Sequence, residues 1–146
     1  MTLLSPLAAA IAELAADPAV QALVGLDVAG VRRIRSIEPA AGDSLGPGAW
    51  LAFVVVTVLD SPVRPRTPVR DVILGIKAYA ATDPAAEALW LACESVFADR
   101  GARRAASGLG VWHSECRSIG PDRDPATLQP LWHGTVSYPT TLASVT

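Results

Sequence analysis

The sequence predicts an α+β domain: an antiparallel or mixed sheet of roughly four to five strands, with one main helix packed across one face and short N-terminal helices. Two observations carry the prediction. Residues 69–80 alternate their side chains with period two, so that Leu74 and Ile76 fall on one apolar face. Residues 84–99 place apolar side chains at three- and four-residue spacing, which indicates an amphipathic helix. A strand and a helix of this kind pack on each other.

The composition is that of one globular domain over residues 1–146. Apolar residues make up 51% of the chain and charged residues 18%, which argues against disorder. The net charge of −2 gives no overall attraction to nucleic acid or to an acidic membrane. Two cysteines fit a reducing compartment better than a disulfide scaffold. The apolar run over residues 49–59 is too short to cross a bilayer, and the N-terminus lacks a signal peptide. We therefore expect a soluble, intracellular protein.

Two short helices are expected before the sheet. Ser5 and Asp17 are good N-cap residues, and the proline after each suits the first helical position, where no N–H is needed. The first helix should end near Ala16. The second should cover residues 19–24, with Gly25 just past its end.

Two strands and a projecting loop are expected next. Residues 31–37 indicate a short edge strand with exposed arginines. Residues 50–59 are apolar on both faces, which is typical of a strand in a covered sheet or against a partner subunit. Residues 60–68 contain three prolines with Arg64 and Arg66, so they predict a stiff basic loop that projects between two antiparallel strands.

The main helix is expected to begin at Asp83 as its N-cap. Its apolar stripe comprises Ala85, Ala88, Leu89, Ala92, Cys93 and Val96. Residues 100–110 are basic and rich in small residues, so we expect a mobile segment. Residues 111–119 and 131–141 indicate two further strands, joined by a polar connection.

The chain holds more apolar surface than one small sheet–helix core needs. Leu51, Phe53 and Val55 share the second face of their strand, and Trp90 and Phe97 lie on the flank of the main helix, away from its stripe. Either the N-terminal helices cover these side chains or another subunit does, because apolar area alone does not distinguish a core from an interface. The five residues are therefore candidates for a subunit interface.

The polar cluster Trp112-His113-Ser114-Glu115-Cys116 contains residue types used in catalysis. In a strand, His113 points away from Ser114 and Cys116, so a base and a nucleophile cannot meet there. The histidines and cysteines lack the spacing of a metal site, and no glycine-rich phosphate motif occurs. The sequence thus predicts no enzyme, and no catalytic, metal or cofactor site.

Three basic clusters are most simply solvated surface, since aromatic residues do not alternate with them as in nucleic-acid-binding proteins. They comprise Arg32, Arg33 and Arg35, then Arg64, Arg66 and Arg70, then Arg100, Arg103 and Arg104.

Several stretches together carry a family resemblance. They are IAELAADPAVQALVG at residues 11–25, WLAFVVV at 50–56, VRDVILGIKAYAATDPAAEAL at 69–89 and YPTTL at 138–142. In this order they resemble the tail-terminator or tail-completion proteins of long-tailed bacteriophages and gene transfer agents. The chain departs from the common pattern in the long segment 100–110 and in the elongated loop 60–68.

The resemblance implies a structural virion protein. Such proteins form a ring, usually hexameric, at the head-proximal end of the tail tube, end tube polymerisation and join the tail to the head connector. The implied partners are other copies of the chain, the tail tube protein, a head–tail connector or stopper protein, and DNA that passes through the lumen without sequence-specific binding; no membrane is involved. The implied location is the virion tail, with the host cytoplasm during assembly. Arg64 and Arg66 are candidates to face the lumen or a neighbouring ring.

Two other classes of function stay open. One is a different head-to-tail connector or minor tail protein of the same architecture, which position in the particle would identify. The other is a cytoplasmic ferredoxin-like module for ligand binding or dimerisation, which a stable dimer and a ligand-dependent melting shift would identify.

Overall fold

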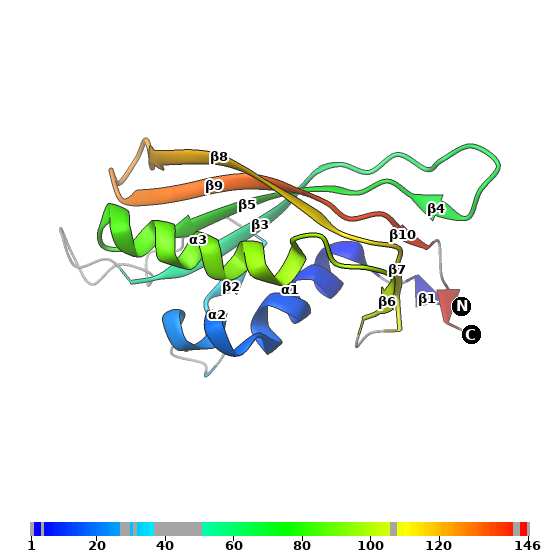
Figure 1. Ribbon diagram of the computed structural model, residues 1–146, viewed down its shortest axis with the longest axis horizontal. Helices are drawn as coiled ribbons and strands as arrows, with labels where there is room; N and C mark the ends of the chain where they lie inside the picture. The colour runs from blue at the N-terminus through cyan, green and yellow to red at the C-terminus, as the bar shows by residue number, and fades with distance from the viewer. Residues whose placement is uncertain are drawn as a thin grey trace.

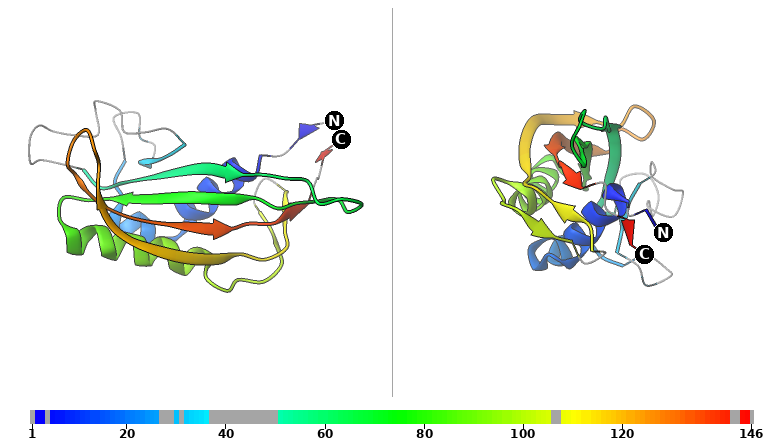
Figure 2. Two further views of the ribbon diagram at one scale, coloured as in Figure 1. Left: turned by 90° about the horizontal axis from the view of Figure 1, so that it is seen from above. Right: turned by 90° about the vertical axis from the view of Figure 1, so that its right-hand side faces the viewer.

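The computed structural model describes residues 2–3, 5–26, 30, 32–36, 51–105, 108–141 and 144–145. It confirms the predicted α+β fold. A five-stranded sheet has the order β2-β3-β5-β9-β8, with β2 parallel to β3 and the other neighbours antiparallel. Helix α3 lies along one face of this sheet, and α1 and α2 lie on the same side (Figure 1, Figure 2). No described helix has the length and apolar character needed to span a membrane.

The described elements have the following bounds. The helices are α1 (Pro6–Ala16), α2 (Pro18–Leu23) and α3 (Asp83–Phe97). The strands are β1 (Thr2–Leu3), β2 (Ile34–Arg35), β3 (Phe53–Asp60), β4 (Val69–Arg70), β5 (Ile73–Tyr79), β6 (Arg103–Arg104), β7 (Gly110–Val111), β8 (Glu115–Arg123), β9 (Pro130–Ser137), β10 (Thr140–Thr141) and β11 (Ser144–Val145).

The helix starts follow the predicted capping chemistry, with one correction. Ser5 and Asp17 accept N–H groups three residues ahead, each at 3.1 Å, so both N-caps are confirmed. For α3 the N-cap is Thr82, whose hydroxyl accepts the Ala85 N–H at 3.3 Å. The prediction of Asp83 as the N-cap was therefore wrong. Asp83 lies in the first turn, where the positive end of the helix dipole stabilises its carboxylate.

The strand predicted over residues 69–80 divides into β4 and β5. Asp71 and Val72, between these two strands, belong to neither of them. The Asp71 N–H donates to the Pro62 carbonyl at 2.9 Å, and the Val72 carbonyl accepts the Tyr138 N–H at 2.8 Å. In β5, Leu74 and the alternate residues after it are buried against the helix side, as predicted.

The strands near the C-terminus also differ from their predicted bounds. The strand expected over residues 111–119 is two strands, because β7 ends at Val111 and β8 begins at Glu115. Strand β8 runs on to Arg123 through a register shift between Ser118 and Gly120. A bulge of this kind keeps the strand paired with β9 over a stretch that the sequence indicates as a loop.

The edge strand expected over residues 31–37 is reduced to β2, and parts of that range lie outside the described residues. Its arginines were expected to be exposed, but Arg32 and Arg33 are half-buried. Their guanidinium groups donate to the carbonyl groups of Val24 and Ala52, each at 2.9 Å. These contacts tie the segment to the end of α2 and to the residue just before β3.

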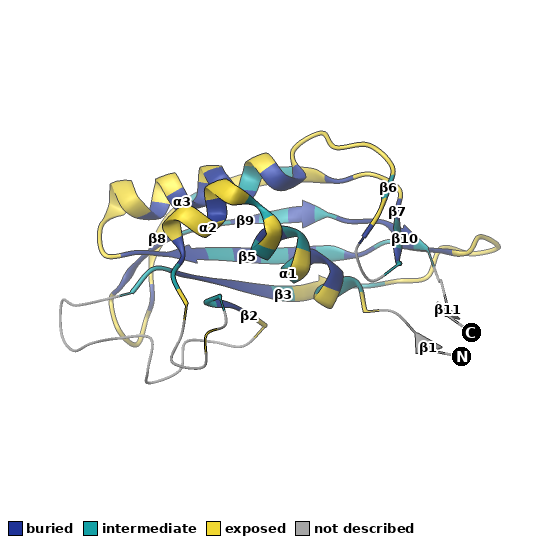
Figure 3. Ribbon diagram, turned by 90° about the horizontal axis from the view of Figure 1, so that it is seen from below, coloured by how far each residue is buried: buried dark blue, intermediate teal, exposed yellow. Residues whose placement is uncertain are grey.

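The core between α3 and the sheet uses most of the predicted stripe, since Leu89, Ala92, Cys93 and Val96 are buried, but it is wider than predicted. Ala85 and Ala88 are exposed, whereas Trp90 and Phe97 are fully buried. Trp90 reaches the sheet because Gly134 has no side chain: a Cβ there would lie 2.3 Å from the indole ring. The outer faces of the helices stay exposed (Figure 3).

A second, small antiparallel sheet with the order β4-β10-β7-β6 lies at one end of the main sheet. It was not predicted. Residues 100–110 were expected to be mobile, but their described part contributes β6 and reaches the first residue of β7. Short strands two residues long carry no recognisable periodicity, so only the tertiary pairing defines them.

Candidate functional site

The most prominent feature outside the core is a hairpin arm, residues 61–72, which projects beyond the end of the main sheet (Figure 1, Figure 2). Its two sides are joined by a bridge between Val63 and Arg70. The Arg70 guanidinium also donates to the Ser61 carbonyl at 3.0 Å. The arm is thus a hydrogen-bonded ribbon, and the sequence had predicted a stiff basic projection at this place.

The two arginines proposed for this loop differ in their surroundings. Arg64 forms a two-pronged pair with Asp71, with N–O distances of 2.7 and 3.2 Å. The hydrogen bond from Arg64 is the main cause that lowers the pKa of Asp71, and the same bond raises the pKa of Arg64. Arg66 is exposed in the turn at the tip, with a φ of 60° that favours glycine. Within the described part of the chain it has no ion-pair partner.

A hollow of about 330 Å³ lies at the base of the arm. Trp112, on the short link after β7, lines it and is 51% exposed. Its other lining residues are Arg64, Thr67, Pro68, Val69, His113 and Pro139. A half-exposed tryptophan beside an apolar hollow is typical of a contact residue. Sequence reasoning treated Trp112 only as part of a strand; its place before β8, outside regular structure, comes from the fold.

The predicted interface residues lie elsewhere. Phe53 and Val55 are at most 1% exposed on the face of the sheet away from α3, where Phe53 stacks on Tyr79 with ring centroids 4.4 Å apart. Trp90 and Phe97 are equally buried against the sheet. These four side chains are covered by the chain itself, and a role for them at a subunit interface stays a prediction. Leu51 is half-buried.

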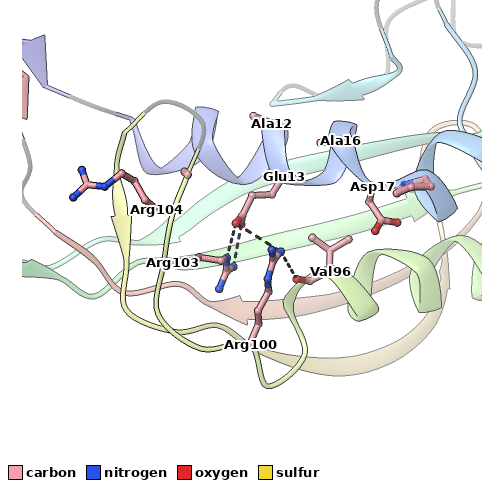
Figure 4. A pocket seen from close by; sticks show the side chains of 10 residues that line it. Ala12, Glu13, Ala16, Asp17, Val96, Arg100, Arg103 and Arg104 are labelled. Atoms are coloured by element: carbon pink, nitrogen blue, oxygen red, sulfur yellow. Dashed lines mark hydrogen bonds and ion pairs between the residues drawn. The ribbon is translucent and has the colours of Figure 1, made fainter.

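A second polar cluster joins α1 to the small sheet (Figure 4). Glu13 on α1 meets Arg103 on β6, with N–O distances of 2.5 and 3.0 Å. The same carboxylate accepts the Tyr138 hydroxyl at 2.7 Å, and Arg103 also donates to Ser114 at 3.0 Å. Arg100 lies 3.9 Å from Glu13. The cluster thereby links four segments that are distant in the sequence.

This cluster borders a hollow of about 330 Å³ between α1 and the segment after α3. The side chains of Glu13 and Arg103 are only 11% and 12% exposed. Burial, and then the hydrogen bond to Glu13, raise the pKa of Tyr138. The side chains of Glu13 and Arg103 thus bond mainly to groups that are distant in the sequence, which is the arrangement of a structural clamp.

The cluster with catalytic residue types has no catalytic geometry in the fold. Ser114 is fully buried and holds Arg103, while His113 is exposed. Burial raises the pKa of the Cys116 thiol to about 12, and it raises that of Cys93 as well, so both thiols stay protonated. Within the described ranges, no three His, Cys, Asp or Glu side chains gather as metal ligands.

Neither a protein-family model nor a curated protein matches the sequence. The fold is similar to that of a chain in a solved structure described as "Virion of native gene transfer agent (GTA) particle", with a TM-score of 0.54 and 16% sequence identity. The similarity covers 92% of this chain and 92% of that chain. The two chains therefore share a fold over nearly their whole length.

Proposed function

We propose that the protein is a structural component of a bacteriophage or gene-transfer-agent particle and, within that class, a tail terminator. It forms a ring, which we expect to be hexameric, at the head-proximal end of the tail tube. There it ends tube polymerisation and joins the tail to the head connector. The observation that carries the proposal is the fold shared over nearly the whole chain with a component of a gene transfer agent virion. The ordered resemblance of the sequence to tail terminators supports the finer assignment.

The arm supplies the contact surface for this role. It is exposed, preformed and basic, and it carries Arg64 and Arg66 beyond the packed part of the molecule. A preformed ribbon loses little conformational entropy when it meets a partner. In the assembled tail the arm faces the lumen or the neighbouring ring. Scattered charges in a lumen suit DNA that slides, because a tight basic groove would hold the phosphates.

The test of the assignment is assembly without the protein. Particles produced in its absence should show tails of uncontrolled length and free heads by negative-stain microscopy. Supplying the wild-type chain should restore joined particles of uniform tail length, with rings whose symmetry the images reveal. Tails of normal length, joined to heads, in the absence of the chain would reject the terminator role. A compact dimer that melts at higher temperature with a small ligand would favour the ligand-binding module instead.

The role of the arm is tested with the double variant Arg64→Glu and Arg66→Glu. We expect complementation to fall at least about tenfold, since a reversed charge repels the surface that the native arm meets. Arg117→Glu is the matched control, because Arg117 is an exposed arginine on β8, outside the arm. Normal head joining in the double variant would show that the arm is ordinary solvated surface.

A further inference from the structure

The two ends of the molecule carry complementary features. The arm lies at one end, and the start of α3 lies with the β8–β9 turn at the opposite end (Figure 1, Figure 2). Features at opposite ends of one chain cannot meet within that chain. If they fit each other, the contact joins two copies.

The end opposite the arm holds a hollow of about 450 Å³ between α3 and the β8–β9 turn. Its apolar lining consists of Pro84, Pro121 and the half-buried ring of Trp132. The indole N–H of Trp132 donates to the Ser118 hydroxyl at 2.8 Å, which fixes the ring. An aromatic ring in a preformed apolar groove is a surface on which proline-rich segments dock.

The rim of this hollow is acidic. Three carboxylates line it, from Asp83, Glu87 and Asp122, against one guanidinium, from Arg123. Arg123 pairs with Asp83 at 2.9 Å, and Asp122 lies 4.0 Å from His133. In the described part of the chain Glu87 has no ion pair. The hollow therefore presents negative charge that the chain itself leaves open to a partner.

The arm has the matching chemistry. Pro62, Pro65 and Pro68 recur at every third position along it. Arg64 is already neutralised by Asp71 inside the arm. Arg66 is thus the cation at the tip that is left for a partner. Its backbone has a positive φ of 60°, which glycine would adopt more easily.

We infer that the arm of one copy docks into this hollow of the next copy, with Pro65 at the Trp132 ring and Arg66 facing Glu87 and Asp122. This inference rests on the proposed function and names the subunit contact of its ring; it assigns the tip of the arm to the next subunit, in place of the lumen or the neighbouring ring. Both halves of the contact are present on this chain, and their charges are opposite, which selects a second copy as the occupant. A contact between different surfaces of identical subunits closes into a ring or continues as a filament.

The experiment is sedimentation velocity over a concentration series for the wild type, Arg66→Glu, Glu87→Arg and an equimolar mixture of the two variants. The wild type should associate. Each variant alone should associate at least roughly tenfold more weakly than the wild type, because like charges then face each other. The mixture should regain association, since the reversed arm of one variant fits the reversed hollow of the other. Circular dichroism confirms that each variant is folded.

Arg117→Glu and Glu115→Arg are the controls, because they make the same charge changes at exposed positions of β8 outside both surfaces. They should associate as the wild type does. A wild type that stays monomeric throughout, single variants that associate normally, or a mixture that fails to recover would each overturn the contact. If particle assembly requires the protein but its charge variants associate as the wild type does, only this contact is rejected. Normal tails without the protein would reject only the proposed function.

Discussion

Two of the arginine–carboxylate pairs in the described part of the chain share a similar geometry but lie in opposite surroundings. Arg103 and Glu13 meet with both side chains at most 12% exposed, and they join α1 to β6. Arg64 and Asp71 meet on the arm, with side chains 51% and 39% exposed. Water solvates the second pair in the folded and the unfolded chain alike, but it is largely excluded from the first.

The surroundings, not the residue types, therefore set what such a pair does. A buried charge that loses its partner is left without solvation, so the inner pair fixes the position of α1 against the small sheet. An exposed charge that loses its partner is solvated at once, so the outer pair contributes little to folding and leaves the arm free for contact.

The largest effect is expected from Arg103→Met. This change removes the directly bonded cation of the Glu13 carboxylate in a site that water barely reaches and leaves the half-exposed Arg100, 3.9 Å away, as a weak substitute. It should lower the free energy of unfolding by about 3 kcal/mol. Urea denaturation followed by circular dichroism measures the change.

The double variant Arg103→Met and Glu13→Leu is the control for that experiment. Removing both charges leaves no unpaired carboxylate at this buried site, so much of the lost stability should return, although the Tyr138 hydroxyl loses its acceptor, Ser114 its donor and Arg100 its nearby carboxylate. If the single and the double variants were equally unstable, packing rather than the unpaired charge would explain the loss.

An intermediate effect is expected from Asp124→Asn. Asp124 is 7% exposed and, among the residues that the structure describes, has no arginine partner; it accepts the N–H groups of Ala126 and Thr127 at 2.9 and 3.0 Å. Burial opposes its ionised form, but these bonds and the Tyr79 hydroxyl outweigh burial and lower its pKa. At neutral pH the variant should be less stable by about 1 kcal/mol, because its hydrogen bonds lose their charge.

The pH dependence of that difference has a definite sign. A pKa lowered in the folded state gives stability that is fully present above the unfolded value, near 3.8, and is lost as the pH falls through the folded value. Urea midpoints of wild type and Asp124→Asn should therefore converge below about pH 4. A constant gap from pH 7 to pH 3 would mean that the charge of Asp124 contributes nothing.

The smallest effect on stability is expected from Arg64→Ala. The urea midpoint should not move, because both partners of this pair are solvated. The pKa of Asp71, followed by NMR, should rise toward its ordinary value, since the hydrogen bond from Arg64 is the largest cause of its lowering. Arg117→Ala should change neither quantity. A clear loss of stability in Arg64→Ala would erase the contrast between the two pairs.

Local chemistry in the sequence determined the main elements. The Ser-Pro and Asp-Pro pairs set the starts of α1 and α2, and alternation over β5 showed which face is buried. The prolines and arginines of residues 61–68 were enough to predict a stiff basic projection. Each of these signals acts within a few neighbouring residues, so no knowledge of the rest of the fold is required.

Tertiary structure decided everything that depends on distant partners. Trp90 and Phe97 were expected on the flank of the main helix, under the N-terminal helices or another subunit, yet both are fully buried in the chain itself. Trp90 reaches the sheet because Gly134 opens space for its indole on a strand far along the chain. Arg103 was expected in a mobile basic segment, but it pairs with Glu13, 90 residues earlier. A sequence gives the types of the charged and aromatic residues; which of them water reaches is a property of the packed chain.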